Sequence, residues 1–168
     1  MPPEINLEKI ALLAEEREDE NYRFRSYLKG RNGDETDSFV HRLNKEISAQ
    51  IDCTSCGNCC KSFMISVEPA ELEPLAAGLG QTAEAVKTKY MEESSQGDLI
   101  VNTIPCHFLS DNKCTVYEHR FHTCREFPHL HTPQFTSRLF SVMQHYAICP
   151  IVFNVVEALK EEVGFMIF

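Results

Sequence analysis

The stretch CTSCGNCC, residues 53–60, holds four cysteines within eight residues, and it limits what this chain can fold into. Cys53, Cys56 and Cys59 form a C-x2-C-x2-C run. Each two-residue step lets the backbone turn around one ion with both sulfurs facing it. Gly57 permits the positive φ that a tight turn of this kind uses. Because clustered thiolates add negative charge that a cation must offset, the spacing predicts a metal site in preference to inert buried cysteines.

The adjacent pair Cys59 and Cys60 raises the question of how the cysteines are shared. Successive side chains leave the backbone in different directions, so neighbouring cysteines seldom ligate one ion. Either the two face different centres, or one ligates while the other packs. A second four-sulfur site can be drawn from Cys60, Cys106, Cys114 and Cys124, and the remote Cys149-Pro150 can complete the first. One centre with spare cysteines remains the other option. The candidate metal ligands are Cys53, Cys56, Cys59, Cys60, Cys106, Cys114, Cys124 and Cys149.

Charge and composition indicate the compartment of such a protein and the classes of partner that it is not expected to bind. The net charge of −9 argues against binding a nucleic-acid backbone and against binding an anionic membrane surface. The acidic start of the chain lacks the basic and apolar parts of a secretory signal, and no apolar run reaches membrane-spanning length. We therefore expect a cytoplasmic protein. In that reducing compartment, eight cysteines favour metal binding or catalysis over disulfides.

The apolar periodicity predicts a mainly α fold with a small β-hairpin, in an irregular single domain stapled by metal. At 168 residues the chain is long enough for one core and short for two. We expect an N-terminal helical hairpin, residues 1–51, packed on a cysteine-cluster metal-binding domain, residues 52–168. The pattern predicts helices over 4–28, 38–51, 66–80, 82–94, 133–149 and 150–163, a strand within 97–104, a hairpin around Asp111-Asn112, and an irregular loop over 118–132.

Four motifs taken together resemble a known family. They are CTSCGNCC, CHFLSDNKCTVY, CREFP and the late CP, and all eight cysteines fall in the order of the YkgJ-type cysteine-cluster family, also called the CxxCxxCC family of zinc- or iron-chelating domains. The resemblance covers about residues 53–150. Flagellin N-methylases carry a related cysteine cluster that is associated with an iron–sulfur cluster. The resemblance therefore implies a chelated metal centre, with iron–sulfur and zinc both open.

The chain departs from the family at one point and lacks one element of the methylases. The family commonly has Arg-Pro shortly before the CR-x-FP cysteine, whereas this chain has Arg120-Phe121, which affects the local turn and not the ligands. No Gly-rich strand-to-helix turn is present for a methyl donor. Methyl transfer is accordingly not carried over from the resemblance.

The residues around Cys124 are candidates for supporting roles. His122 is the best candidate ligand other than a cysteine, because it stands two residues before Cys124. Arg120 and Arg125 flank the same cysteine, and their guanidinium groups can offset thiolate charge. We expect three aromatic side chains to shield the centre from water: Phe108, Tyr117 and Phe127.

Three functions remain open at this stage. The first is a small protein holding an iron–sulfur cluster, with 4Fe–4S as the candidate type, that has a redox or accessory enzymatic role and an unknown protein or redox partner. The alternative is a zinc-binding structural or interaction module with one or two four-cysteine sites. The third is thiol chemistry at a reactive Cys60. No hydrolase, phosphate-loop or metalloprotease motif is present, so no catalytic residue is assigned and enzymatic activity is left open.

Overall fold

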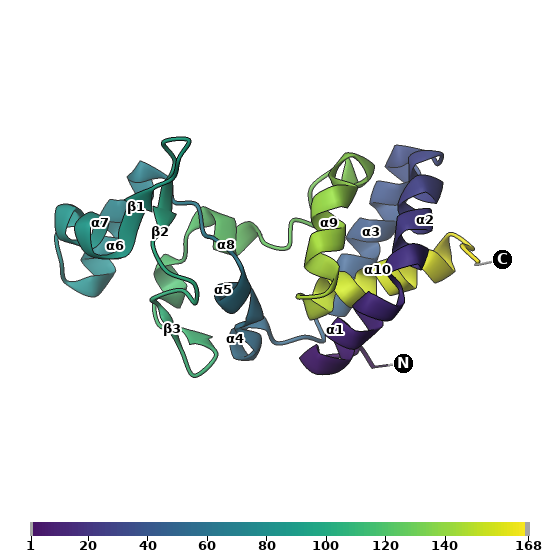
Figure 1. The fold of residues 1–168 in the computed structure, drawn as a ribbon, viewed down its shortest axis with the longest axis horizontal. Coiled ribbons are helices and arrows are strands. Elements are labelled where there is room, and N and C mark those ends of the chain that lie inside the picture. Colours follow the sequence, from purple (N-terminus) through teal and green to yellow (C-terminus); the bar gives the residue numbers. More distant parts are fainter. Residues whose placement is uncertain (1, 167–168) are drawn as a thin grey trace. The chain divides into compact units, whose positions relative to one another are not determined.

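The computed structural model describes residues 2–166 and is mainly α-helical, with two small antiparallel sheets of two strands each (Figure 1). This confirms the predicted fold class, apart from the metal staple. No helix in the described chain combines the length and the apolar character needed to cross a bilayer.

The chain divides into two compact units. The helical unit comprises Met1–Asp52 and Pro128–Phe168, and the cysteine unit comprises Cys53–Phe127. The C-terminal helices therefore group with the N-terminal helices, whereas we expected residues 52–168 to group together. Whether 1–51 and 52–168 behave as domains stays a prediction.

The helical unit is built from long helices with recognisable caps. A single helix over 4–28 was the wrong expectation: Arg17, at φ −101° and ψ 15°, separates two helices, and three acidic residues open the second, where they favour a helix start. The next helix begins at Gly33, earlier than predicted, because the Asn32 side chain accepts a hydrogen bond from the Glu35 amide. The elements are α1 (Leu7–Glu16), α2 (Glu18–Lys29), α3 (Gly33–Ser48), η3 (Phe135–Arg138), α9 (Leu139–Tyr146) and α10 (Pro150–Glu162).

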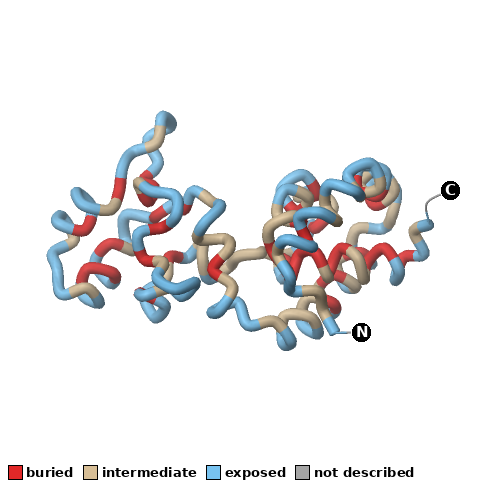
Figure 2. Tube along the Cα trace, turned by 60° about the horizontal axis from the view of Figure 1, so that its bottom comes forward, coloured by how far each residue is buried: buried red, intermediate tan, exposed pale blue. Residues whose placement is uncertain are grey.

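Helix α10 forms the centre of this unit and packs against α3 and α9. Much of α10 is buried (Figure 2). Four of its side chains are fully buried: Val152, Val155, Val156 and Leu159. Burying one such side chain contributes about 1.5–3 kcal/mol. The helical unit thus has an apolar core of its own.

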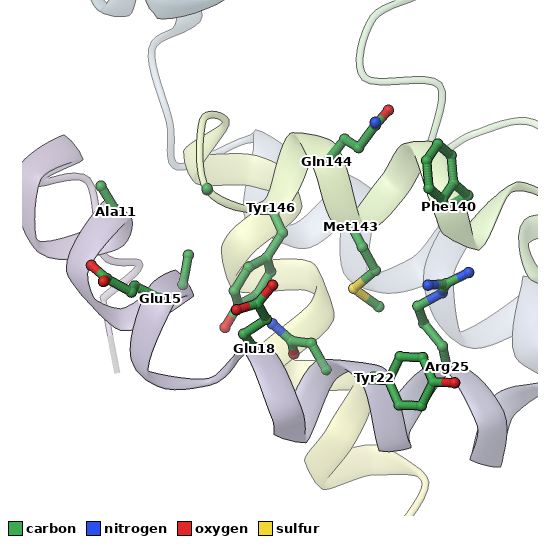
Figure 3. Close-up of a pocket in the computed structure, with 12 residues that line it drawn as sticks. Ala11, Glu15, Glu18, Tyr22, Arg25, Phe140, Met143, Gln144 and Tyr146 are labelled. Carbon is green, nitrogen blue, oxygen red and sulfur yellow. The ribbon is translucent and has the colours of Figure 1, made fainter.

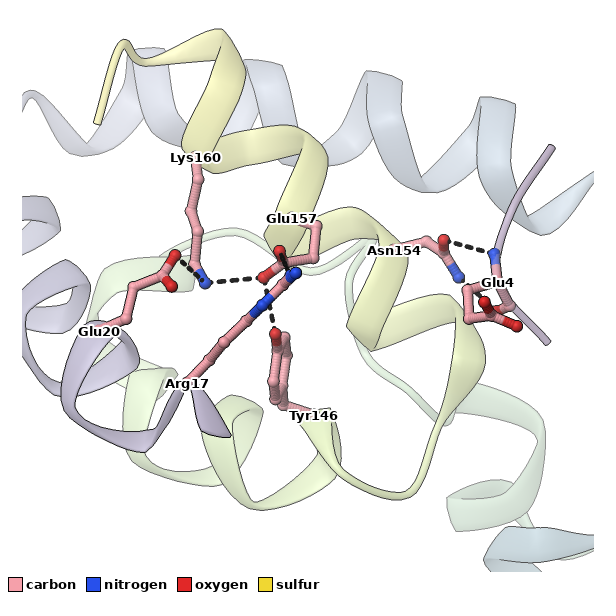
Figure 4. A network of polar contacts seen from close by, with 7 residues as sticks. All are labelled: Glu4, Arg17, Glu20, Tyr146, Asn154, Glu157 and Lys160. Carbon is pink, nitrogen blue, oxygen red and sulfur yellow. Dashed lines mark hydrogen bonds and ion pairs between the residues drawn. The ribbon is translucent and has the colours of Figure 1, made fainter. Parts of the chain in front are cut away.

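A buried polar network fixes α10 against α2 and α9 (Figure 4). Lys160, only 5% exposed, lies 2.8 Å from Glu20 and 2.7 Å from Glu157. The Tyr146 hydroxyl donates to Glu157 at 2.6 Å, and Arg17 pairs with the same carboxylate. A charge this deeply buried needs such partners, so the network holds these helices in one register.

The cysteine unit is made of much shorter elements. Its β3–β4 turn has Asp111 at φ 48° and Asn112 at φ 63°, which confirms the predicted hairpin. Thr82 caps α7 as its position predicts. The elements are α4 (Cys53–Cys56), α5 (Asn58–Ser62), η1 (Pro69–Glu71), α6 (Leu72–Leu79), α7 (Ala83–Tyr90), β1 (Met91–Glu93), β2 (Leu99–Val101), β3 (Leu109–Ser110), β4 (Lys113–Cys114), η2 (Tyr117–His119) and α8 (His122–Glu126).

The predicted loop over 118–132 is wrong in part, because it contains α8 and the end of η2. Both are single turns, too short for a 3.6-residue apolar pattern to appear.

Candidate metal centre

Two single-turn helices present the first four cysteines. Helix α4 carries Cys53 and Cys56, and α5 carries Cys59 and Cys60. Gly57 joins them at φ 63°, a left-handed conformation that favours glycine. Cys53 is exposed, and the other three are half-buried. Gly57 therefore lets the chain turn between the two cysteine-bearing helices, and the convergence of their sulfurs on one ion stays a prediction.

The β3–β4 hairpin is the support on which this reversal rests. A Cβ placed on Gly57 would lie 2.7 Å from the backbone oxygen of Asn112, so only glycine fits the contact. The Lys61 ammonium also donates to the Asn112 side chain, and α4 packs against β4. Sequence reasoning identified Asn112 as a turn residue but missed this second role, because the turn signal says nothing of what the turn contacts.

The later cysteines of the unit gather beside the same segment. The Cys106 amide donates to the Cys60 carbonyl at 2.8 Å, and Cys114 pairs with Leu109 in the hairpin. Cys106 belongs to the apolar core of the unit, and three half-buried cysteines pack against that core: Cys60, Cys114 and Cys124. The four cysteines that the sequence grouped as a second set thus share one apolar environment.

The adjacent thiols of Cys59 and Cys60 are hydrogen-bonded to each other. The Cys60 thiol donates to Cys59, and this lowers the pKa of Cys59 to about 7. The same bond holds the proton on Cys60, so the pKa of Cys60 is raised, and burial raises it further. The doublet therefore contains one thiol that ionises easily and one that resists ionisation.

Burial and mutual repulsion keep the remaining thiols of the core protonated. Burial raises the pKa of Cys106, of Cys114 and, to about 12, of Cys124. The negative charge of Cys59 raises the pKa of all three as well. Cys59 thus lies within electrostatic reach of the other four cysteines, and a bound cation that displaces their protons would relieve the repulsion.

A positive charge faces this group. The Arg120 guanidinium stacks 3.6 Å from the centre of the Tyr117 ring, and its charge counters the rise in pKa of Cys114 and Cys124. The buried Nε of Arg120 has no hydrogen-bond partner in the described chain. This places Arg120 where its charge can balance thiolates, as its position beside Cys124 predicts.

The expected aromatic shell is only partly as predicted. Phe108 is buried and packs against Phe121. Phe121 stands where the family commonly has a proline, and sequence reasoning noted it only as a departure from the family and missed its packing role. Phe127 packs on Phe63. Tyr117 is 40% exposed and supports Arg120 instead of covering the cysteines.

The remaining candidates lie as follows. Cys149 belongs to the helical unit, where it is buried and precedes α10. The His122 amide donates to Glu71 at 2.5 Å, and the exposed His122 side chain stays only a candidate.

Between residues 2 and 166, no three His, Cys, Asp or Glu side chains are already arranged to hold a metal ion. The donors are of the kind that a thiolate-bound metal needs, and the assignment of individual cysteines as ligands stays a prediction.

A comparison with protein families places the chain. A model named CxxCxxCC, described as a putative zinc- or iron-chelating domain, matches residues 52–149, which is more than half of the chain. The chain belongs to this CxxCxxCC family. The matched segment contains all eight cysteines, so membership supports a metal-binding cysteine cluster and names zinc and iron alike. Searches of curated proteins and of solved structures found no match.

Proposed function

We propose that this CxxCxxCC protein holds an iron–sulfur cluster on its cysteine unit and serves a redox or accessory enzymatic role in the cytoplasm. The observation that carries the proposal is that four cysteines gather at one apolar core, within electrostatic reach of Cys59: Cys60, Cys106, Cys114 and Cys124. An iron–sulfur centre is held by thiolates, and its potential depends on burial and on hydrogen bonds to sulfur. A cluster bound here would supply one-electron chemistry to a protein partner.

The chain's own residues prepare the site in three ways. The Cys59 thiol, whose pKa is lowered to about 7, ionises readily and can start ligation. The Gly57 reversal brings α4 and its two cysteines beside β4. The buried Phe108 and Phe121 keep water from the apolar side. We propose Cys53, Cys56 and Cys59 as the first ligands, with the final one drawn from the other five cysteines.

A zinc-binding structural module is the second candidate, and the shortness of the elements favours it. Helices α4 and α5 have four and five residues, and strands β3 and β4 have two each. Isolated helices and hairpins of this length are not stable in water. A closed thiolate site for zinc would hold such pieces together without further chemistry.

Anaerobic purification followed by an absorption spectrum and assays of iron, sulfide and zinc on one sample separates the candidates. A cluster predicts a brown protein with a broad band near roughly 400 nm and matched iron and sulfide. A colourless protein with stoichiometric zinc overturns the iron–sulfur proposal and establishes the zinc module. Absence of every metal from protein purified this way and from protein reconstituted with iron and sulfide or with zinc refutes both.

A further inference from the structure

The helical unit carries an open groove of about 480 Å³ between helices α1 and α2 on one side and α9 on the other (Figure 3). Its apolar lining includes the small side chains Ala11, Ala14 and Ala147, together with Met143. Small residues leave a trough into which a partner's larger side chains can enter. None of the features assigned to the metal centre belongs to this groove.

Two large side chains at the edge of the groove are strongly exposed. Tyr22 on α2 is 68% exposed, and Phe140 on α9 is 64% exposed. The Arg25 guanidinium lies 5.8 Å from the centre of the Phe140 ring, at the same end of the groove (Figure 3). Aromatic and arginine side chains next to an apolar trough are typical of the residues that contribute most to protein–protein binding.

Two buried polar atoms of the lining have no partner in the described chain. Asn21 is only 7% exposed, and its Oδ1 accepts no hydrogen bond, while its amide bonds to the Tyr146 hydroxyl. The Nε of Arg25 is likewise without an acceptor. Both atoms are buried, so recognition of a ligand depends on the exposed aromatic side chains and on the charges of the lining.

The charges of the lining are separated along the groove. Glu15 and Glu18 lie at the junction of α1 and α2, and Arg25 lies farther along α2 (Figure 3). Arg25 stands seven positions after Glu18, which corresponds to about 10 Å along the helix, or about two turns. A complementary ligand therefore carries a basic group and an acidic group separated by about two helical turns, with apolar groups between them.

We propose that this groove binds an amphipathic helix of a protein partner, with a basic residue opposite Glu15 and Glu18 and an acidic residue opposite Arg25. Helix-in-groove recognition uses apolar anchors spaced three and four residues apart. The spacing of the charges in the groove matches two turns of such a helix. The trough lined by alanines receives the anchors, and Tyr22 and Phe140 cover them from the sides.

The test uses fluorescence anisotropy with the full chain and three labelled alanine-rich peptides of about 16 residues, since shorter helices are marginal in water. The first peptide has leucines between a lysine and a glutamate placed seven positions apart. The second has glutamate at both charged positions, and the third has lysine at both. We expect the mixed peptide to bind about threefold to fivefold more tightly than either of the others.

Variants of the chain then locate the binding. The double variant Tyr22→Ser with Phe140→Ser should bind the mixed peptide about fivefold or more weakly. The matched control Ile5→Ser with Leu12→Ser should leave the affinity for the mixed peptide unchanged, because these side chains are 63% and 55% exposed but do not line the groove. Arg25→Glu should reverse the preference toward the peptide with two lysines. Circular dichroism checks that every variant is folded.

Four results would overturn the proposal. The first two are equal affinity for the three peptides and no binding of any of them. The third is that the control pair Ile5→Ser with Leu12→Ser weakens binding of the mixed peptide as much as Tyr22→Ser with Phe140→Ser does. The fourth is a concentration-dependent dimer, seen by sedimentation, that Phe140→Ser abolishes. The last result would show that the groove is an interface between copies of this chain. None of these results bears on the metal content of the cysteine unit, so this proposal fails or holds separately from the proposed function.

Discussion

The two units of this protein are built by different means. The helical unit has α3 with 16 residues and α10 with 13, and fully buried valine and leucine side chains form its core. The cysteine unit has cysteine-bearing elements of two to five residues. Long amphipathic helices are stabilised by the apolar surface they bury, whereas single turns need something else to hold them. We infer that the first unit folds without metal and the second depends on it.

Removing ligands from the first turn should have the largest effect. We expect Cys53→Ser with Cys56→Ser to abolish metal binding and to unfold the cysteine unit, since metal binding contributes on the order of 10 kcal/mol to folding of small thiolate sites. Metal analysis and thermal unfolding measure both effects. Met64→Ser, at an exposed position of the same unit, is the control. Unchanged metal content in the double variant would refute the metal site as drawn.

A cavity in the helical unit should affect that unit alone. Leu159 is fully buried on α10, so Leu159→Ala should lower the free energy of unfolding by about 2–5 kcal/mol. The metal-to-protein ratio should not change. Leu12→Ala, at a side chain 55% exposed, should cost much less. If Leu159→Ala also releases the metal, the two units are not independent and the comparison fails.

A pair of glycine variants isolates the contact between the cysteine turn and the hairpin. Gly57 and Gly80 both have left-handed φ, 63° and 64°, but only Gly57 is close to another segment, at Asn112. Each alanine should cost about 1 kcal/mol for backbone conformation. Gly57→Ala should destabilise the cysteine unit further and weaken metal uptake, as denaturation and metal titration would show. Equal effects at both positions would mean that the Asn112 contact contributes nothing.

The smallest effect is the pH dependence of a single thiol. In protein stripped of metal, alkylation of Cys59 should rise with pH through a midpoint near 7, because only the thiolate reacts and Cys60 stabilises it. Cys60→Ala removes that hydrogen bond, so the midpoint should move up toward the ordinary thiol range. Mass spectrometry of iodoacetamide-treated samples follows the reaction. A midpoint that Cys60→Ala leaves in place would show that another group lowers the pKa.

The sequence predicted those features that depend on local chemistry. The structure confirms three of them: the helix cap at Thr82, the turn at Asp111-Asn112, and the helix start at the proline that opens α10. The break at Arg17 was missed, because apolar and acidic residues continue across it.

Features that depend on tertiary contacts could not be predicted in the same way. The support of Gly57 by Asn112 joins positions 55 residues apart, and no local pattern reports such a contact. The grouping of the C-terminal helices with the N-terminal ones is of the same kind: amphipathicity shows that a face is buried and not what covers it. Cys60, Cys106, Cys114 and Cys124 lie at one apolar core, and their sharing of a metal stays a prediction.

Hydrogen exchange of the full chain, with metal bound and after removal of the metal by a chelator under reducing conditions, tests the central claim most directly. Amides within Cys53–Phe127 should lose their protection when the metal is removed, while those of α3 and α10 should keep it. Protection that persists in both units without metal would contradict the account, because the cysteine unit would then hold its fold without a metal staple.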